Sequence, residues 1–291
     1  MFHIIKLRKI WYAISLILVV ISVVSLSTQG LNLGIDFTGG NIVELKFKNP
    51  TTTEDVRNIL AEYKLEDSQI QSGGENDFFI RTRVLSQEES DKAFSNIGEK
   101  LGGATILRNE LVGPVVGKEL TQKALLALAV ASVLILIYIS WRFEFWQGVS
   151  AFIGLLHDAL IMVGLASVFQ IEIDSSFVAA VLTVIGYSIH DSIIIFDRIR
   201  ENLRINRKEE LTTLINKSLW QTMARSINTV LTVVFVLLSL FLLGGSTIHS
   251  FVALLLIGIV CGAYSSIFTA GPLWYDLRQL QNRKKAAKAQ A

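Results

Sequence analysis

Six runs of mostly apolar residues, each close to the length that crosses a lipid bilayer, constrain the fold of this 291-residue chain more than any other feature. A helix needs about 20 such residues to span a hydrocarbon core of about 30 Å. Backbone polar groups inside a bilayer must be hydrogen-bonded within the protein, which favours helices. We therefore expect a membrane protein with six transmembrane helices. The runs cover residues 10–26, 124–139, 149–169, 177–196, 227–243 and 251–273.

The composition agrees with a membrane protein that carries one water-soluble segment. Hydrophobic residues make up 51% of the chain, and the mean hydropathy is +0.49. Residues 27–121 contain fifteen acidic and ten basic residues, a net charge of −5, although the whole chain has a net charge of +2. The remainder therefore has a net charge of +7, most of it in short segments beside the apolar runs.

No residue pattern indicates a metal, a cofactor or a nucleic acid. The single cysteine, Cys261, excludes a disulfide within the chain and is expected to be a small buried apolar residue. The four histidines lack the spacing of a structural zinc site. The glycine-rich segment 34–40 has no Gly-Lys-Ser/Thr ending, so a nucleotide-binding loop is not indicated.

The first apolar run follows a basic segment with Lys6, Arg8 and Lys9, as in a signal peptide. The run is longer than the 7 to 15 residues of a typical signal-peptide core, and no Ala-x-Ala cleavage pattern follows it. We expect residues 1–30 to be a cytoplasmic N-terminus and a retained first span.

Residues 31–121 have the composition of a water-soluble α+β domain. Alternating apolar residues predict a strand at 41–48, a hairpin at 68–71 and 77–83 around Gly73 and Gly74, and a last strand at 104–112. Capping-box patterns at Thr51-x-x-Glu54 and Ser86-x-x-Glu89 predict two helices, the first over residues 54–64. The order β-α-β-β-α-β is typical of a ferredoxin-like sandwich with both helices on one face of an antiparallel sheet.

Basic residues alternate between the loops, which predicts the orientation of the spans. The loops after spans two, four and six contain lysines and arginines, whereas the two other loops, QIEIDSS and GGSTIHS, contain none. By the positive-inside rule both termini are cytoplasmic, in an inner membrane, and the soluble domain is extracytoplasmic. We expect residues 122–274 to form the bundle of spans two to six with a cytoplasmic loop at 198–226, whose helix 207–220 lies along the surface, and residues 275–291 to form a basic cytoplasmic tail.

The fourth run carries an adjacent His190 and Asp191 near its middle, where an ionisable group costs about 3 kcal/mol on insertion scales. Helical spacing places Thr183 and Tyr187 on the same side, with two serines at its flanks. Such a stripe faces other helices or water rather than lipid. We expect this span to be an inner helix of the bundle.

A second acid lies in the third run, at His157 and Asp158. The two spans run in opposite directions, and a rise of 1.5 Å per residue places Asp158 and Asp191 at similar depths, offset by about one helical turn.

Several motifs, in order along almost the whole chain, resemble the SecF family. They are GIDFTGG at 34–40, VGPVVG at 112–117, LLHD at 155–158 and VIGYSIHDSIIIFDRIREN at 184–202. We expect their small or turn-forming residues to have structural roles; these are Gly34, Asp36, Gly39, Gly40, Gly113, Pro114 and Gly186.

The resemblance implies a fold, partners and a function. The fold is one six-span half of a twelve-span bundle of the resistance-nodulation-division type, completed by the partner SecD. The function is proton-motive-force-driven assistance to the export of unfolded preproteins through the SecYEG channel, with YajC as a further partner and no enzymatic activity.

The resemblance also implies a proton site. The family's carboxylate in span four corresponds to Asp191, and its arginine at the start of span five to Arg225 in QTMARS. Many relatives have asparagine where this chain has His190. Burial favours the neutral form of an acid and a nearby cation favours the charged form, so we expect Arg225 to approach Asp191 in one state and withdraw in another.

A purely structural role is an open alternative for each of these residues. Asp191 alone can act as a static polar bridge between helices, and Arg225 as an anchor at the end of a span. His157 and Asp158 fit either an interhelical bond or a proton relay, and His190 fits a packing role.

Two other functions also stay open. Asp158 and Asp191 on neighbouring spans fit an intramembrane aspartyl hydrolase if their carboxyl groups meet beside a cavity. A small-molecule exporter would share the fold and the proton chemistry, but a single domain of about ninety residues is small for substrate binding.

Overall fold

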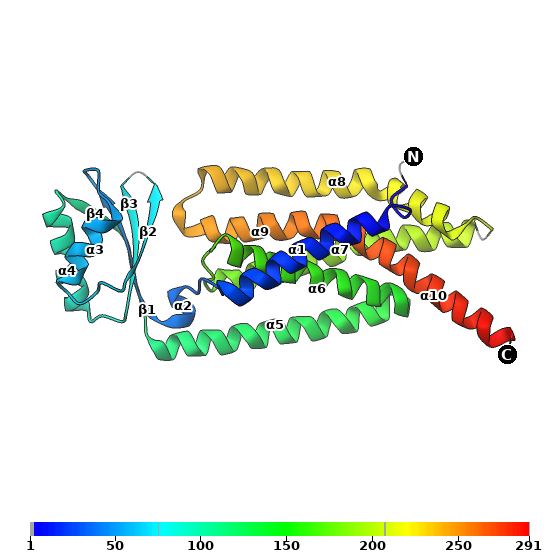
Figure 1. Ribbon diagram of the computed structural model, residues 1–291, viewed down its shortest axis with the longest axis horizontal. Coiled ribbons are helices and arrows are strands. Elements are labelled where there is room, and N and C mark those ends of the chain that lie inside the picture. The colour runs from blue at the N-terminus through cyan, green and yellow to red at the C-terminus, as the bar shows by residue number, and fades with distance from the viewer. Residues whose placement is uncertain (1–2, 75, 207, 291) are drawn as a thin grey trace. The chain divides into compact units, whose positions relative to one another are not determined.

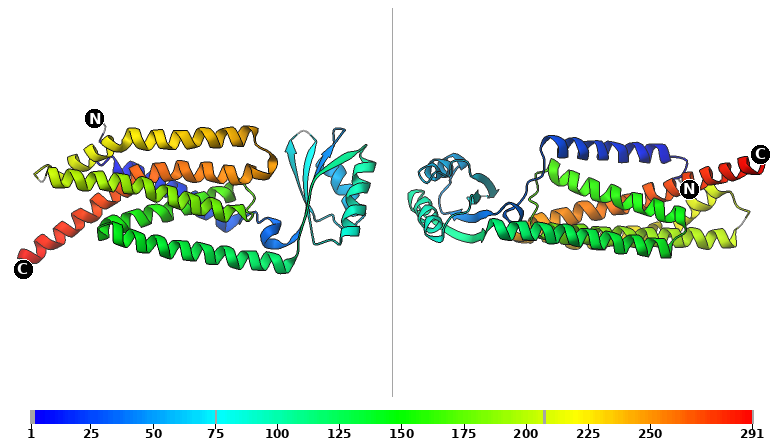
Figure 2. Two further views of the ribbon diagram at one scale, coloured as in Figure 1. Left: turned by 180° about the vertical axis from the view of Figure 1, so that it is seen from behind. Right: turned by 90° about the horizontal axis from the view of Figure 1, so that it is seen from below.

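The structure, a computed structural model, describes residues 3–74, 76–206 and 208–290. Two compact units make up the chain, one of Leu33–Leu126 and one of Met1–Asn32 with Ala127–Ala291 (Figures 1 and 2). Among the basic residues considered for orientation, Arg207 lies outside the described residues, as do the side chains of Lys284, Lys285 and Lys288.

The first unit has the predicted α+β architecture between the first and second spans. Its four antiparallel strands lie in the order β2-β3-β1-β4, which is the ferredoxin-like order. Helices α3 and α4 both lie on one face of the sheet (Figure 1). The elements are α2 (Ile35–Thr38), β1 (Gly40–Phe47), α3 (Thr53–Ala61), β2 (Gln69–Gly74), β3 (Asp77–Thr82), α4 (Gln87–Lys100) and β4 (Ala104–Val112).

The core of this unit lies between the sheet and the two helices. Strand β3 alternates, with Phe78 and Ile80 buried, as expected for a strand with one covered face. Phe78 meets Phe47 of β1 edge to face, with ring centroids 5.5 Å apart. Amphipathic spacing brings Val56 and Leu60 of α3, together with residues of α4, onto this layer.

Both helices of this unit begin with a capping box. The box predicted at Ser86 and Glu89 is confirmed. The box predicted at Thr51 and Glu54 is wrong by one residue, because Thr52 and Asp55 exchange the bonds. Either pair fits the sequence pattern, and the difference arises because Thr52, not Thr51, directly precedes the first helical residue.

The glycine motif after the first span meets the segment that precedes the second. Gly40 has a φ of +140°, and a Cβ atom there would lie 2.6 Å from the carbonyl oxygen of Thr82. Gly39 has a φ of +72° and lies against Pro114. A Cβ atom on Gly117 would lie 3.3 Å from the carbonyl oxygen of Asp36. The two motifs therefore fit together because side chains are absent at the contact.

The second unit contains the helical bundle, and six helices of the described chain are long and apolar enough to cross a membrane. The six-span fold class is therefore confirmed. The helices are α1 (Arg8–Thr28), α5 (Pro114–Arg142), which begins in the first unit, α6 (Phe145–Val168), α7 (Ser176–Ile205), α8 (Leu211–Leu243), α9 (Ser246–Ser265), the π-helix η1 (Ser266–Ala270) and α10 (Gly271–Gln290).

Two features of these helices differ from the sequence-based expectation. The surface helix expected at 207–220 is not separate, because residues from Leu211 onward belong to the continuous helix α8. The last span is not a single α-helix, because the π-helical turn η1 separates α9 from α10. No glycine or proline lies within α8 to interrupt it, which explains its length.

The bundle has inner and peripheral helices. In the most apolar 18-residue stretch of each span, about half of the residues are buried in α6 (56%), α7 (44%) and the last span (50%). The corresponding share is 6% in α5 and 11% in α8. Trp274 and Phe196, both fully buried, meet edge to face in the core. The fourth span is therefore an inner helix, as its polar stripe predicts.

Helices α1 and α6 approach each other through small side chains. Ser25 and Ser167 share a hydrogen bond of 2.8 Å between their hydroxyl oxygens. A Cβ atom on Gly164 would lie 2.0 Å from the Cβ of Ser22 and 2.5 Å from its Cα. Small residues at such contacts are how membrane helices pack closely.

We predict that Gly164→Ala lowers the free energy of unfolding by about 1 to 3 kcal/mol, because the new methyl group forces two backbones apart. Alanine stabilises a helix relative to glycine by up to about 1 kcal/mol, so the sign of the change reports the clash. The matched control is Gly186→Ala in α7, where an added Cβ meets nothing within 4 Å. Thermal unfolding of the purified chain in detergent measures both, and equal stability of the two variants would contradict the close contact.

We also predict an acid-sensitive start of α3 and α4. Hydrogen bonds from Thr52 lower the pKa of Asp55 below its ordinary 3.8, and those from Ser86 lower the pKa of Glu89 below its ordinary 4.5. A lowered pKa means that these caps stabilise the helices fully above the ordinary values and lose that effect as the pH falls through the folded pKa. Amide hydrogen exchange of the first turns, corrected for intrinsic rates, should show protection that decreases as the pH is lowered from 7 through the folded pKa values of these two carboxyl groups. The variant D55N/E89Q should show a smaller decrease of protection over the same pH range, because these two capping carboxylates no longer titrate.

Candidate functional site

The carboxyl group of Asp158 lies at the centre of a buried polar cluster in the bundle. It belongs to α6, and its residue is 1% exposed. Its Oδ2 accepts hydrogen bonds of 2.6 Å from Ser188 on α7 and 2.6 Å from Ser265 on α9. Its Oδ1 lies 3.0 Å from Nδ1 of His157. Three polar side chains from three helices thus compensate one buried carboxyl group.

Asp191 on α7 is also buried, at 4% exposure, but has fewer partners. Its Oδ1 accepts a hydrogen bond of 2.7 Å from Ser226 on α8. Its Oδ2 is buried and has no hydrogen-bond partner in the described part of the chain. One oxygen is therefore satisfied and the other is available for a proton or an incoming donor.

A series of hydrogen-bonded serines connects the environments of Asp158 and Asp191. These serines belong to α7, α9 and η1. Ser192, the residue after Asp191, donates to Ser266 at 3.4 Å. Ser266 lies 3.5 Å from the carbonyl oxygen of Ser188, whose hydroxyl binds Asp158. Ser188 precedes Asp191 by three residues, or about 4.5 Å along α7, which agrees with the expected offset of one helical turn.

The two histidines that directly precede the acids in the sequence, His157 and His190, occupy different environments. His157 is largely buried and stacks on Tyr264, with ring centroids 6.3 Å apart, and its Nε2 has no partner among the described residues. His190 is exposed on α7. The structure thus brings His157 to Asp158 but turns His190 away from the bundle core.

Arg225 is exposed on α8, one residue before the serine that binds Asp191. No nitrogen of the Arg225 side chain lies within 4.0 Å of a carboxylate oxygen of Asp191 in the described structure. The sequence therefore places Arg225 next to Ser226, the partner of Asp191, but the described structure contains no ion pair between Arg225 and Asp191.

The serine partners were not predicted as site residues. Ser265 and Ser266 lie in an apolar run and Ser226 directly precedes one; serine is common at such places, and only the position opposite an acid distinguishes these three. Among the residues that sequence analysis assigned structural roles, Gly34, Gly39, Gly40, Gly113 and Pro114 belong to the other unit.

The geometry gives no support to a hydrolytic dyad. Asp158 and Asp191 each bind their own serines, and no hydrogen bond between the two carboxyl groups occurs among the described residues. No cluster of three or more histidine, cysteine or acidic side chains in that part of the chain could hold a metal ion. The arrangement suits proton exchange and interhelical bonding.

Comparisons with known proteins give one consistent result. Residues 93–280 match the family described as "Protein export membrane protein SecD/SecF, C-terminal", and residues 24–51 match the "SecD/SecF GG Motif". The chain is 40% identical to the protein translocase subunit SecF of Sebaldella termitidis, over 97% of this chain and 94% of that protein. It is also 40% identical to SecF of Acidaminococcus fermentans, over 97% of this chain and 99% of that protein.

A solved structure has the same fold. The crystal structure of SecDF, a translocon-associated membrane protein from Thermus thermophilus, is similar with a TM-score of 0.89 and 33% identity. The similarity covers 96% of this chain and 39% of the solved chain. The present chain therefore spans well under half of that protein.

We predict that Ser188→Ala and Ser265→Ala are coupled. Each removes one donor to the same oxygen of Asp158, at about 0.5 to 2 kcal/mol in the free energy of unfolding. The double variant leaves that oxygen without a partner, so its loss should exceed the sum of the single losses. Ser140→Ala is the control, because its exposed hydroxyl donates only to the carbonyl of Leu136 in its own helix. Strictly additive losses in a denaturant titration would contradict the shared acceptor.

Proposed function

The chain belongs to the SecD/SecF family of protein export membrane proteins, as a SecF-type subunit, and on this premise we propose that it couples the proton motive force to protein export together with a SecD partner. The observation that carries the proposal is Asp191, a carboxyl group buried within a membrane bundle with one oxygen left without a partner. A buried ionisable group in a membrane helix is a functional site by default, because its burial is costly.

Association with SecD is supported by the polar residues that the bundle leaves exposed. His190, Arg225 and Asn228 lie on the exposed sides of α7 and α8 within or beside apolar runs. None of their side chains forms a hydrogen bond within the described part of the chain. Lipid tails would leave these groups unsatisfied, so a second set of helices is the better neighbour. The solved SecDF chain, of which this chain spans 39%, is large enough to contain such a set.

The proposed cycle alternates between two states of Asp191. In one state Arg225 approaches the free Oδ2 and favours the carboxylate; in the other it withdraws, and the acid takes up a proton from the external side. The exposed, unpaired Arg225 of this structure corresponds to the withdrawn state. One elementary charge moved through a potential of 100 mV supplies about 2.3 kcal/mol, enough to bias such a two-state element.

Asp158 and His157 act as a second proton-binding site in this proposal. The serines between the two acids provide hydroxyl groups that both donate and accept, as a proton relay requires. His157 offers an unpartnered ring nitrogen at the same place. His190 is exposed and forms no hydrogen bond or ion pair with either acid among the described residues, so we assign it to the contact with the partner.

The orientation follows the basic loops, with both termini cytoplasmic and the α+β unit extracytoplasmic. In this orientation proton passage rearranges the spans, and the external domains help an unfolded preprotein to leave the SecYEG channel. YajC is a further partner in this proposal.

Two alternatives carry less support. A small-molecule exporter would share the bundle, but the relatives that match along the full chain are named as protein translocase subunits. A static polar bridge at Asp191 would require only its bond to Ser226 and leaves the free oxygen unexplained.

We predict that Asp191→Asn abolishes the part of export that depends on the proton gradient. The amide retains the shape of the side chain and its acceptor for Ser226, but it cannot exchange a proton. Membrane vesicles that contain this variant should export a preprotein at the rate of wild-type vesicles treated with an uncoupler. The variant protein should still insert and co-purify with SecD.

Asp174→Asn is the matched control, because Asp174 lies in the loop before α7 and accepts a hydrogen bond of 2.9 Å from the backbone of Ser176. This variant should keep gradient-dependent export. If Asp191→Asn also keeps it, the static polar bridge is the better explanation and the proton-coupling proposal fails.

A further inference from the structure

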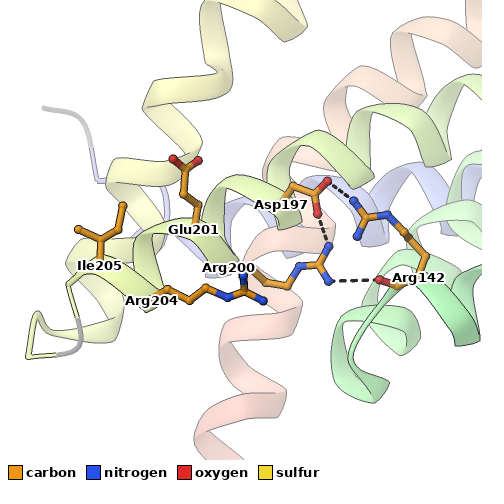
Figure 3. A pocket seen from close by; sticks show the side chains of 6 residues that line it. All are labelled: Arg142, Asp197, Arg200, Glu201, Arg204 and Ile205. Carbon is orange, nitrogen blue, oxygen red and sulfur yellow. Dashed lines mark hydrogen bonds and ion pairs between the residues drawn. The ribbon is translucent and has the colours of Figure 1, made fainter.

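A pocket at one end of the bundle lies between the last residue of α5 and the final turns of α7. Its volume is about 400 Å³. Figure 3 shows Asp197 between two arginines, with Arg204 extending along α7 toward Arg200. The lining residues are Arg142, Asp197, Arg200, Glu201, Arg204 and Ile205.

Asp197 holds two of these arginines in place. Its Oδ2 pairs with Arg142 and its Oδ1 with Arg200. Arg200 also donates to the carbonyl oxygen of Arg142 at 3.2 Å. One carboxylate thus neutralises one of two guanidinium groups and fixes the positions of both, which leaves one positive charge and several unused N–H donors facing the pocket.

Arg204 adds a second positive charge that no acid in the pocket balances. Arg204 is exposed and forms no ion pair or hydrogen bond within the described residues. Glu201 does not offset it, because Glu201 pairs with Arg198 at 2.8 Å. The nearby Glu144 pairs with Arg278 at 3.7 Å. The pocket therefore presents a surplus of two positive charges.

An apolar stripe leads from the pocket along α5. Trp141, directly before Arg142, is 85% exposed, and Phe145 after it is 73% exposed. Tryptophan is typical of the boundary between lipid tails and headgroups, so the arginines lie at headgroup level. The stripe follows helical spacing and contains Val130, Val133, Leu134, Ile137, Tyr138 and Trp141.

We propose that this pocket binds the headgroup of an anionic phospholipid, with acyl chains against the apolar stripe of α5. Guanidinium groups bind phosphate oxygens through paired N–H donors, and basic pockets between membrane helices suit such headgroups. The surplus of two positive charges matches the two phosphates of cardiolipin better than the single phosphate of phosphatidylglycerol. The bound lipid would tie the end of α5 to α7, together with Asp197.

Binding of defined lipids to the full-length chain in detergent tests the proposal, with native mass spectrometry or a fluorescent lipid analogue as readout. Affinity should decrease in the order cardiolipin, phosphatidylglycerol, phosphatidylcholine. Arg204→Gln should weaken cardiolipin binding about fivefold, the effect of one basic residue near an anionic lipid. Arg204 makes no contact that folding requires, so size-exclusion and thermal-unfolding profiles should match the wild type.

Arg283→Gln is the matched control, because it removes one positive charge from an exposed arginine of α10 that lies outside the pocket lining and forms no ion pair with an acid among the described residues. Equal affinity of wild type and Arg204→Gln, or equal losses in both variants, would overturn the proposal. Complete competition by inorganic phosphate at the concentration of cardiolipin would show that the site binds a free anion rather than a lipid. Loss of cardiolipin when SecD is bound would show that the partner protein occupies the pocket.

Discussion

The structure of the bundle depends on how it compensates two carboxyl groups that are buried among apolar helices. Each acid would be costly in this environment without hydrogen-bond donors. Asp158 receives two serine hydroxyls from two other helices, and Asp191 receives one from α8. These bonds define how α6, α7, α8 and α9 are rotated relative to one another. The buried share of α6 and α7 follows from the same requirement, because a helix that carries an acid must face its neighbours.

The α+β unit depends on a different constraint, the close approach of backbone segments. Gly40 lies against the carbonyl of Thr82, and Gly39 against Pro114 at the start of α5. The strand that follows the first span and the helix that forms the second therefore begin at one point. This explains why the glycine motif and the segment VGPVVG occur together, although about seventy residues of the chain separate them.

The sequence allowed the acids to be predicted but not their partners. Asp158 and Asp191 stand out because ionisable residues are rare in apolar runs. Ser226 and Ser265 do not, because a serine in a membrane helix becomes a partner only through the rotation of that helix, which no local pattern encodes. The strand order was predictable because β-α-β-β-α-β allows few compact sheets. The capping box at Thr52 and the continuous start of α8 were missed because adjacent threonines and a basic segment fit two descriptions equally well.

The π-helical turn η1 allows side chains before and after it in the last span to face the core of the bundle. Ser265 points to Asp158, and Trp274, nine residues later, is fully buried in the core. At about 100° per residue, an uninterrupted α-helix would place these side chains about 180° apart, so one of them would point to lipid. A π-turn accommodates one extra residue and reduces the angle to about 80°. A single-residue deletion within 266–270 would therefore convert the turn to α-helix and still leave Trp274 on its present side, because eight residues of α-helix also rotate the chain by a net angle of about 80°.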